Sequence, residues 1–211
     1  MPDIQIKICG LSTPETIDAA VAAGATHVGL VHFAASPRHV TVEQAVKLRR
    51  RVPQQTKVVL LLVNEQPQPM LETIQAVQPD VVQFHGSEPA QMLAVLKQHL
   101  PVEIWKAIGV SDQGVLDRSE RFKGAVDRLL YDAPASKLPG GSGLTFDWQL
   151  LANHKHALPW GLAGGLTPDT VAEAIRVTGA PLVDASTGLE SAPGVKDVDK
   201  IAAFCQAARG A

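Results

Sequence analysis

The sequence predicts an α/β protein with one domain over residues 1–211, folded as a (β/α)8 TIM barrel. Short apolar runs typical of buried strands alternate with helix-like segments along the chain, which indicates parallel βα units. Eight such units can be counted, and eight favour closure into a barrel. An open, doubly wound sheet is the alternative, but no Gly-x-Gly-x-x-Gly motif follows the first strand-like run, which favours the barrel.

Each expected strand is a short apolar run, and the segment after it has helix-like periodicity. The strands are expected at residues 4–8, 26–31, 57–63, 80–84, 102–108, 128–132, 158–163 and 181–185. The helices are expected from about residue 12 and at residues 41–50, 70–77, 88–98, 112–122, 146–153, 168–178 and 197–208. Two helix starts carry capping signals. Ser12 with Glu15 matches a capping box, and Thr167 before Pro168 matches an N-cap followed by proline.

Charge and cysteine content limit the classes of function. The 19 basic and 21 acidic residues nearly balance, so we expect no nucleic-acid or membrane partner. The chain start lacks the apolar core of a secretory signal, and the longest aliphatic run, residues 58–63, is too short to span a bilayer. Cys9 and Cys205 lie near opposite ends and do not suggest a disulfide framework. We therefore expect a cytoplasmic protein in which Cys205 has a packing role.

Two small-residue turns near the end of the chain predict a phosphate site. Gly164-Gly165 follows the seventh strand-like run, and Ser186-Thr187-Gly188 follows the eighth. Glycines let backbone N–H groups approach an anion closely, and the loops after strands seven and eight often bind phosphate in barrels of this type. Either turn alone is more often an ordinary connection, but the pair favours a phosphate.

In a barrel of this kind the chemistry lies at the C-terminal ends of the strands. Cys9 ends the first strand, and Lys7 shares its face one layer below, where an ammonium lowers the pKa of a thiol and favours a thiolate base. A buried packing role for Cys9 is the alternative. Asp132 ends the sixth strand, where partial burial favours the protonated form of a general acid.

The remaining strand ends supply further candidates. Arg38, in the loop after the second strand, could bind a carboxylate or a phosphate, or it could be a solvated loop residue. His85 after the fourth strand is either a substrate ligand or a structural group, and Asp184 is a second carboxylate. Lys7, His85 and Asp184 are counted with Arg38 among the substrate-binding residues. The glycine-rich segment 138–148 could close over a ligand, and Gly141 within it is counted among the phosphate-binding residues. No histidine or cysteine spacing indicates a metal site.

Taken together, these motifs resemble the phosphoribosylanthranilate isomerase family of tryptophan biosynthesis. The matching segments are KICGL at 7–11, SPRHV at 36–40, QFHG at 83–86, YDAP at 131–134, GGSGLTFDW at 140–148, LAGGL at 162–166 and VDASTGLESAPGVKD at 183–197. The resemblance implies that Cys9 is the catalytic base, that Asp132 is the acid and that Arg38 holds the anthranilate moiety. It also implies phosphate ligands at Gly164, Gly165, Ser186 and Gly188.

The reaction that the resemblance implies is the Amadori rearrangement of N-(5-phosphoribosyl)anthranilate to 1-(2-carboxyphenylamino)-1-deoxyribulose 5-phosphate, with no cofactor or metal. The chain departs from the family pattern at His32 and Ala34-Ala35, where an aromatic and lysine-containing stretch is common, and in ASTG, where VSSG is commoner. These changes concern loop packing and leave the acid, the base and the arginine in place. The small-molecule partner is a phosphorylated substrate, and the protein is expected to be a monomer or a homodimer.

Three other functions compete with this one. A metal-dependent sugar-phosphate epimerase needs histidine and aspartate ligands at strand ends, and the related histidine-pathway isomerase needs an aspartate where Cys9 stands. A barrel that binds phosphorylated metabolites without turnover needs neither Cys9 nor Asp132. The presence of both residues favours the isomerase.

Overall fold

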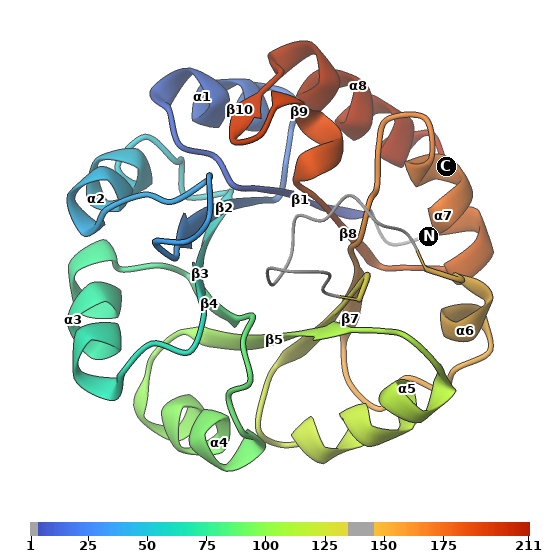
Figure 1. Cartoon of the computed structure of the whole chain (residues 1–211). Coiled ribbons are helices and arrows are strands. Elements are labelled where there is room, and N and C mark those ends of the chain that lie inside the picture. The colour runs from blue at the N-terminus through green and yellow to red at the C-terminus, as the bar shows by residue number, and fades with distance from the viewer. Residues whose placement is uncertain (1–3, 135–145) are drawn as a thin grey trace.

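Eight parallel strands close into a barrel in sequence order, with β8 returning to pair with β1 (Figure 1). The computed structural model describes residues 4–134 and 146–211. The strands are β1 (Gln5–Cys9), β2 (His27–His32), β3 (Lys57–Leu62), β4 (Val81–Phe84), β5 (Glu103–Gly109), β6 (Arg128–Asp132), β7 (Trp160–Leu162) and β8 (Leu182–Ala185). The predicted (β/α)8 barrel is confirmed.

Helices follow the strands and form an outer ring around them (Figure 1). They are α1 (Pro14–Ala22), α2 (Val42–Arg49), α3 (Pro67–Val77), α4 (Ala90–His99), α5 (Gln113–Ser119), α6 (Gln149–Ala152), α7 (Val171–Thr178) and α8 (Val198–Arg209). Two short 3-10 helices, η1 (Glu120–Phe122) and η2 (Thr187–Leu189), and a small antiparallel pair, β9 (Glu190–Ala192) with β10 (Val195–Lys196), complete the described part of the chain. The η2 turn and the β9–β10 pair were not predicted.

The predicted cap of α1, Ser12, is one residue early, and the predicted start of α7 at Pro168 is three residues early. The cap of α1 is Thr13, whose side chain accepts a hydrogen bond from the Thr16 backbone N–H, because Pro14 has no N–H and fits the first helical position. Helix α7 begins at Val171, after a turn in which the Thr170 hydroxyl accepts from the backbone N–H of Thr167 at 3.0 Å. Hydrogen bonds within these short segments decide where each helix begins.

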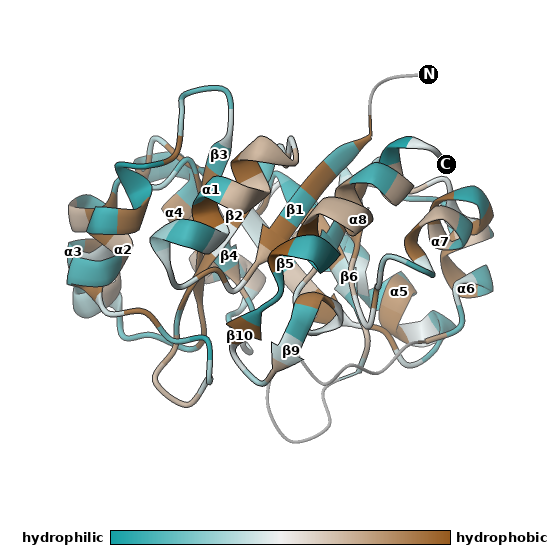
Figure 2. Ribbon diagram, turned by 90° about the horizontal axis from the view of Figure 1, so that it is seen from above, coloured by the Kyte–Doolittle hydropathy of each residue, from teal (hydrophilic) through white to brown (hydrophobic). Residues whose placement is uncertain are grey.

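The core has two parts, one between the strands and the helices and one inside the barrel. Hydrophilic residues cover the outer faces of helices such as α2 and α3 (Figure 2). Cys205 packs in the outer core at 1% exposure, which confirms its packing role, and burial raises its pKa to about 11. In the described residues, no helix is both long enough and apolar enough to cross a membrane.

Candidate active site

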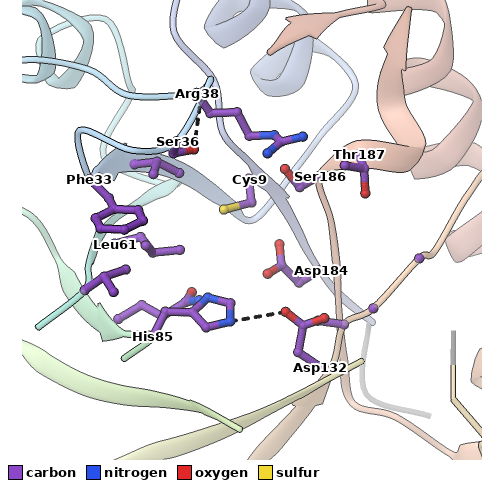
Figure 3. A pocket seen from close by; sticks show the side chains of 16 residues that line it. Cys9, Phe33, Ser36, Arg38, Leu61, His85, Asp132, Asp184, Ser186 and Thr187 are labelled. Atoms are coloured by element: carbon purple, nitrogen blue, oxygen red, sulfur yellow. Dashed lines mark hydrogen bonds and ion pairs between the residues drawn. The ribbon is translucent and has the colours of Figure 1, made fainter. Parts of the chain in front are cut away.

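A pocket opens at the C-terminal ends of the strands (Figure 3). The β9–β10 pair lies at the same end of the barrel (Figure 2). Its lining comes from β1, β3 and β4 and from the segments at the ends of β2, β6, β7 and β8. The residues that line it are Cys9, Val31, Phe33, Ser36, Arg38, Leu61, Val63, Gln83, His85, Asp132, Ala163, Gly164, Gly165, Asp184, Ser186 and Thr187.

Most of the residues predicted from the sequence meet in this pocket, namely Cys9, Arg38, His85, Asp132, Gly164, Gly165, Asp184 and Ser186. Lys7 and Gly188 do not line it. Lys7 is fully buried, because the alternation of side chains along β1 places it one layer below Cys9. Gly141 lies outside the described residues.

One side of the pocket is apolar and was not predicted. Val31, Leu61 and Val63 form a buried cluster with Cys9, and Phe33 packs against it. Figure 3 shows Phe33 and Leu61 on one side of Cys9, and Asp184 and Ser186 on the other. The pocket therefore presents an apolar surface opposite polar groups, an arrangement suited to a ligand with an aromatic ring and a polar end.

Beneath Cys9 lies a buried ion pair. The Lys7 Nζ atom is 2.8 Å from Oδ2 of Asp184, whose strand pairs with β1 in the register that sets the two residues side by side. Burial raises the pKa of the Cys9 thiol, and the Lys7 ammonium opposes this rise without reversing it. Lys7 therefore lowers the pKa of Cys9 as expected, but burial raises it by more, and the net shift of this pKa is upward. Burial also raises the pKa of Asp184, again against the charge of Lys7.

Asp132 faces His85 across the pocket. Oδ2 of Asp132 lies 3.3 Å from Nε2 of His85, and its Oδ1 accepts a hydrogen bond from the Ala133 backbone N–H at 2.8 Å (Figure 3). The segment after β4 that carries His85 contacts a second buried ion pair, which was not predicted. In this pair, Lys106 Nζ lies 3.0 Å from Glu88 Oε2 and also donates to the Gly86 carbonyl oxygen at 2.6 Å.

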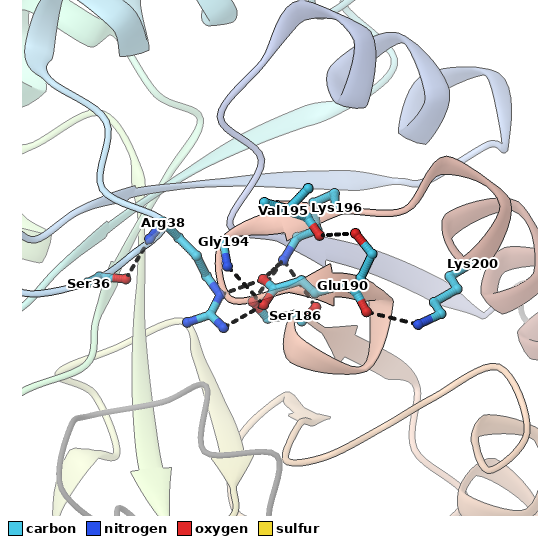
Figure 4. Close-up of polar contacts among 9 residues, drawn as sticks. Ser36, Arg38, Ser186, Glu190, Gly194, Val195, Lys196 and Lys200 are labelled. Carbon is cyan, nitrogen blue, oxygen red and sulfur yellow. Dashed lines mark hydrogen bonds and ion pairs between the residues drawn. The ribbon is translucent and has the colours of Figure 1, made fainter.

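Arg38 has a carboxylate partner that the sequence did not reveal. Its Nε and Nη2 atoms donate to Glu190 at 2.6 and 2.8 Å. Glu190 also pairs with Lys196, which donates to Ser186 in turn (Figure 4). Both Glu190 and Lys196 lie in the segment VDASTGLESAPGVKD, so the motif marked their place, but nothing in it showed which cation Glu190 would meet.

The two small-residue turns come together at the same edge of the pocket. The backbone N–H groups of Gly164, Gly165 and Ser186 donate to no protein acceptor among the described residues. Gly164 has a φ of 89°, and a Cβ there would lie 2.5 Å from the Ala133 nitrogen. Such an array of available N–H groups at close-packed glycines suits an anion.

Gly188 has a different part in this edge. A Cβ at Gly188 would overlap the carbonyl oxygen of Leu166, which belongs to the other turn. The absence of a side chain therefore lets the loops after β7 and β8 pack against each other. Gly188 shapes the anion-binding edge without lining the pocket.

Comparisons with known proteins identify the family of this chain. A family model described as N-(5'-phosphoribosyl)anthranilate (PRA) isomerase matches residues 6–207. A protein of Erythrobacter litoralis named N-(5'-phosphoribosyl)anthranilate isomerase is 65% identical, with 98% of this chain and 99% of that protein covered. The protein of the same name from Zymomonas mobilis subsp. mobilis is 45% identical, with 98% of each chain covered.

Solved structures agree in fold. Phosphoribosyl anthranilate isomerase from Thermotoga maritima has a TM-score of 0.90 and 32% identity, covering 99% of this chain and 100% of that one. A phosphoribosyl anthranilate isomerase in complex with reduced 1-(o-carboxyphenylamino)-1-deoxyribulose 5-phosphate has a TM-score of 0.87 and 31% identity, with the same coverage.

Proposed function

The chain belongs to the N-(5'-phosphoribosyl)anthranilate isomerase family, and we propose for it the Amadori rearrangement of N-(5-phosphoribosyl)anthranilate in tryptophan biosynthesis. The product is 1-(2-carboxyphenylamino)-1-deoxyribulose 5-phosphate. The observation that carries this assignment is the meeting of a thiol, Cys9, and a carboxylate, Asp132, in one pocket between an apolar wall and an anion-binding edge.

Asp132 is the general acid of the first step. It donates its proton to the furanose ring oxygen, and the bond between C1 and that oxygen breaks with its electron pair going to oxygen. The lone pair of the anthranilate nitrogen forms a C1–N double bond, which gives the protonated Schiff base. His85, 3.3 Å from Asp132, orients the carboxyl group. The backbone hydrogen bond from Ala133 holds its second oxygen.

Cys9 is the general base of the second step. Its thiolate removes the proton from C2, and the electron pair of that bond forms the C1–C2 double bond while the iminium nitrogen regains its lone pair. The resulting enolamine tautomerises to the ketone. Because burial raises the pKa of the thiol, the ionised form is a stronger base than an ordinary thiolate, and its population grows with pH.

The remaining residues bind and orient the substrate. Arg38 holds the anthranilate carboxylate, and the apolar wall packs against the aromatic ring. The N–H groups of Gly164, Gly165 and Ser186 hold the phosphate, whose binding energy orients the reacting carbons. The remaining acceptor of Asp184, Oδ1, is buried without a partner among the described residues and suits a sugar hydroxyl.

Lys7 and Gly188 act through their neighbours. Lys7 holds Asp184 in place from below, and Gly188 lets the two phosphate loops meet. Neither residue contacts the substrate in this proposal.

The test is the loss of anthranilate-type fluorescence when the purified protein meets freshly generated phosphoribosylanthranilate. We expect turnover by the wild type and a rate at least about 100-fold lower for Cys9→Ala and for Asp132→Asn, since each removes one proton-transfer group. Circular dichroism serves as the folding control. No turnover by folded wild type would refute the activity, and turnover that survives either substitution would refute that residue's role.

A further inference from the structure

Glu190 is a buried carboxylate at the edge of the pocket that no proton-transfer step uses. Its side chain is 5% exposed, yet it accepts hydrogen bonds from two cations, Arg38 and Lys196, and from the Gly194 backbone N–H at 3.2 Å (Figure 4). We propose that Glu190 is a positioning residue, which holds the Arg38 guanidinium with one edge toward the pocket and so determines recognition of the substrate carboxylate. This inference rests on the proposed function.

The geometry of Arg38 leaves one edge for a ligand. A guanidinium has five N–H donors and two edges that can form a fork with a carboxylate. Glu190 occupies the edge formed by Nε and Nη2. The edge formed by Nη1 and the second Nη2 hydrogen has no acceptor among the described residues. Gly10 makes room for the stem of Arg38, because a Cβ there would lie 2.6 Å from Cδ of the arginine. The two hydrogen bonds to Glu190 therefore fix the orientation of the guanidinium.

Glu190 is itself held by a lysine that cannot touch a ligand. The Lys196 side chain has no exposed surface. Its three N–H donors go to Glu190, to the Ser186 carbonyl oxygen at 3.0 Å and to the Ser186 hydroxyl at 3.3 Å. One hydrogen-bonded chain thus runs from the arginine to the phosphate loop, and it joins the two anion-binding ends of the pocket.

The charges of Arg38, Glu190 and Lys196 also favour an anionic ligand at the free edge of the Arg38 guanidinium. Burial raises the pKa of Glu190, but the hydrogen bonds and charges of Arg38 and Lys196 outweigh it and hold the pKa below its ordinary value. The carboxylate therefore stays ionised at neutral pH. Two cations share this one carboxylate, so the group keeps an excess positive charge, which a substrate carboxylate would balance.

Positioning and simple charge predict opposite effects of removing the Glu190 charge. If Glu190 only weakened the field of Arg38, its loss would strengthen attraction for a carboxylate ligand. If Glu190 holds Arg38 in place, loss of the Glu190 charge frees the Arg38 side chain. Binding of a carboxylate must then also order this side chain, which weakens the affinity. The direction of the change in affinity therefore distinguishes the two roles.

The experiment uses two ligands that differ only in the carboxylate. Reductive amination of ribose 5-phosphate with 2-aminobenzoate gives 1-(2-carboxyphenylamino)-1-deoxyribitol 5-phosphate, and the same reaction with aniline gives the analogue without the carboxylate. Titration calorimetry measures both Kd values for wild type and Glu190→Gln. We expect wild type to prefer the carboxylated ligand by about 10- to 100-fold. Glu190→Gln should lower that preference about tenfold and leave the affinity for the aniline analogue nearly unchanged.

Three further variants sharpen the result. The Lys200 side chain is exposed, and among the described residues its Nζ donates only to the Glu190 backbone oxygen, at 2.8 Å. Lys200→Met is therefore the matched control and should leave both affinities unchanged. Lys196→Met should weaken both ligands, because it removes support from Ser186 as well as from Glu190. Should Glu190→Gln fail to fold, Glu190→Asp keeps the charge but shortens the reach to Arg38, and it should lower the same preference.

The outcomes separate this inference from the proposed function. An unchanged or larger preference for the carboxylated ligand in a folded Glu190 variant would overturn the positioning role, and so would an equal loss for both ligands. A wild type that binds both ligands with the same affinity would also overturn it. A wild type that binds neither ligand would contradict the proposed function itself.

Discussion

Replacement of Lys7 by methionine removes one charge from the buried pair that Lys7 forms with Asp184, a residue that lines the pocket. Lys7 is 0% exposed, and Asp184 Oδ2 lies 2.8 Å from its ammonium. The other carboxylate oxygen, Oδ1, is buried with no hydrogen-bond partner among the described residues. Methionine keeps the approximate length of the side chain without the charge. Lys7→Met therefore leaves Asp184 buried and unpaired.

The expected loss is large relative to the stability of a domain. Breaking a buried ion pair from one side costs about 3–5 kcal/mol, against a total free energy of unfolding of about 5–15 kcal/mol. Burial already raises the pKa of Asp184, with Lys7 opposing that rise, so Lys7→Met should raise this pKa further. Asp184 then binds its proton more tightly in the folded than in the unfolded state. The loss in the free energy of unfolding should therefore be small at low pH. It should grow as the pH rises toward the pKa of Asp184 in the folded variant.

Urea unfolding at about pH 4.5 and about pH 7.5 measures this difference for wild type, Lys7→Met, Asp184→Asn and the double variant. We expect Lys7→Met to lose about 3–5 kcal/mol at the higher pH and clearly less at the lower one. The double variant should recover most of the loss, because neither charge is then left unpaired. A loss below about 1 kcal/mol, or the same loss at both pH values, would refute the argument. Iodoacetamide labelling against pH should also show the pKa of Cys9 moving upward, since Lys7 opposes the rise.

Three further predictions concern the base, acid stability and the phosphate edge. Cys9→Ser should lower kcat by about 100- to 10,000-fold with little change in KM, because a hydroxyl is far less acidic than a thiol; near-normal kcat would exclude Cys9 as the base. Burial lowers the pKa of His27 to about 3. The unfolded chain therefore binds a proton that the folded protein does not, and about 2–3 kcal/mol of stability should be lost between about pH 7 and about pH 4.5. This slope should flatten in His27→Gln, as followed by urea unfolding. Gly164→Ala should cost about 1–3 kcal/mol through its φ of 89° and also lower kcat, because the new Cβ would lie 3.1 Å from Asp132 Oδ1. Gly179→Ala, with a φ of 65° and no atom within 4 Å of the Cβ, should share the strain but keep full activity.

Local patterns in the sequence predict the barrel and the position of most strand-end groups. Alternation of apolar runs with helix-like segments identifies parallel βα units, whose C-terminal ends meet at one rim. Side-chain alternation along β1 then placed Cys9 at that rim and Lys7 one layer below, as the structure confirms. These inferences succeed because they depend on residues close together in the chain and on the fixed geometry of a strand.

The partners of the charged groups depend on long-range contacts that form when the barrel closes. Lys7 meets Asp184 across 177 positions of sequence, and Arg38 meets Glu190 across 152. No local pattern encodes such pairings, because they exist only once β8 has closed the barrel against β1. Closure also buries Cys9, and the desolvation of its thiol outweighs the nearby ammonium and turns the net shift of its pKa upward. Local periodicity thus determines where a side chain lies, whereas its charge state and its contacts depend on how completely the folded chain excludes water around it.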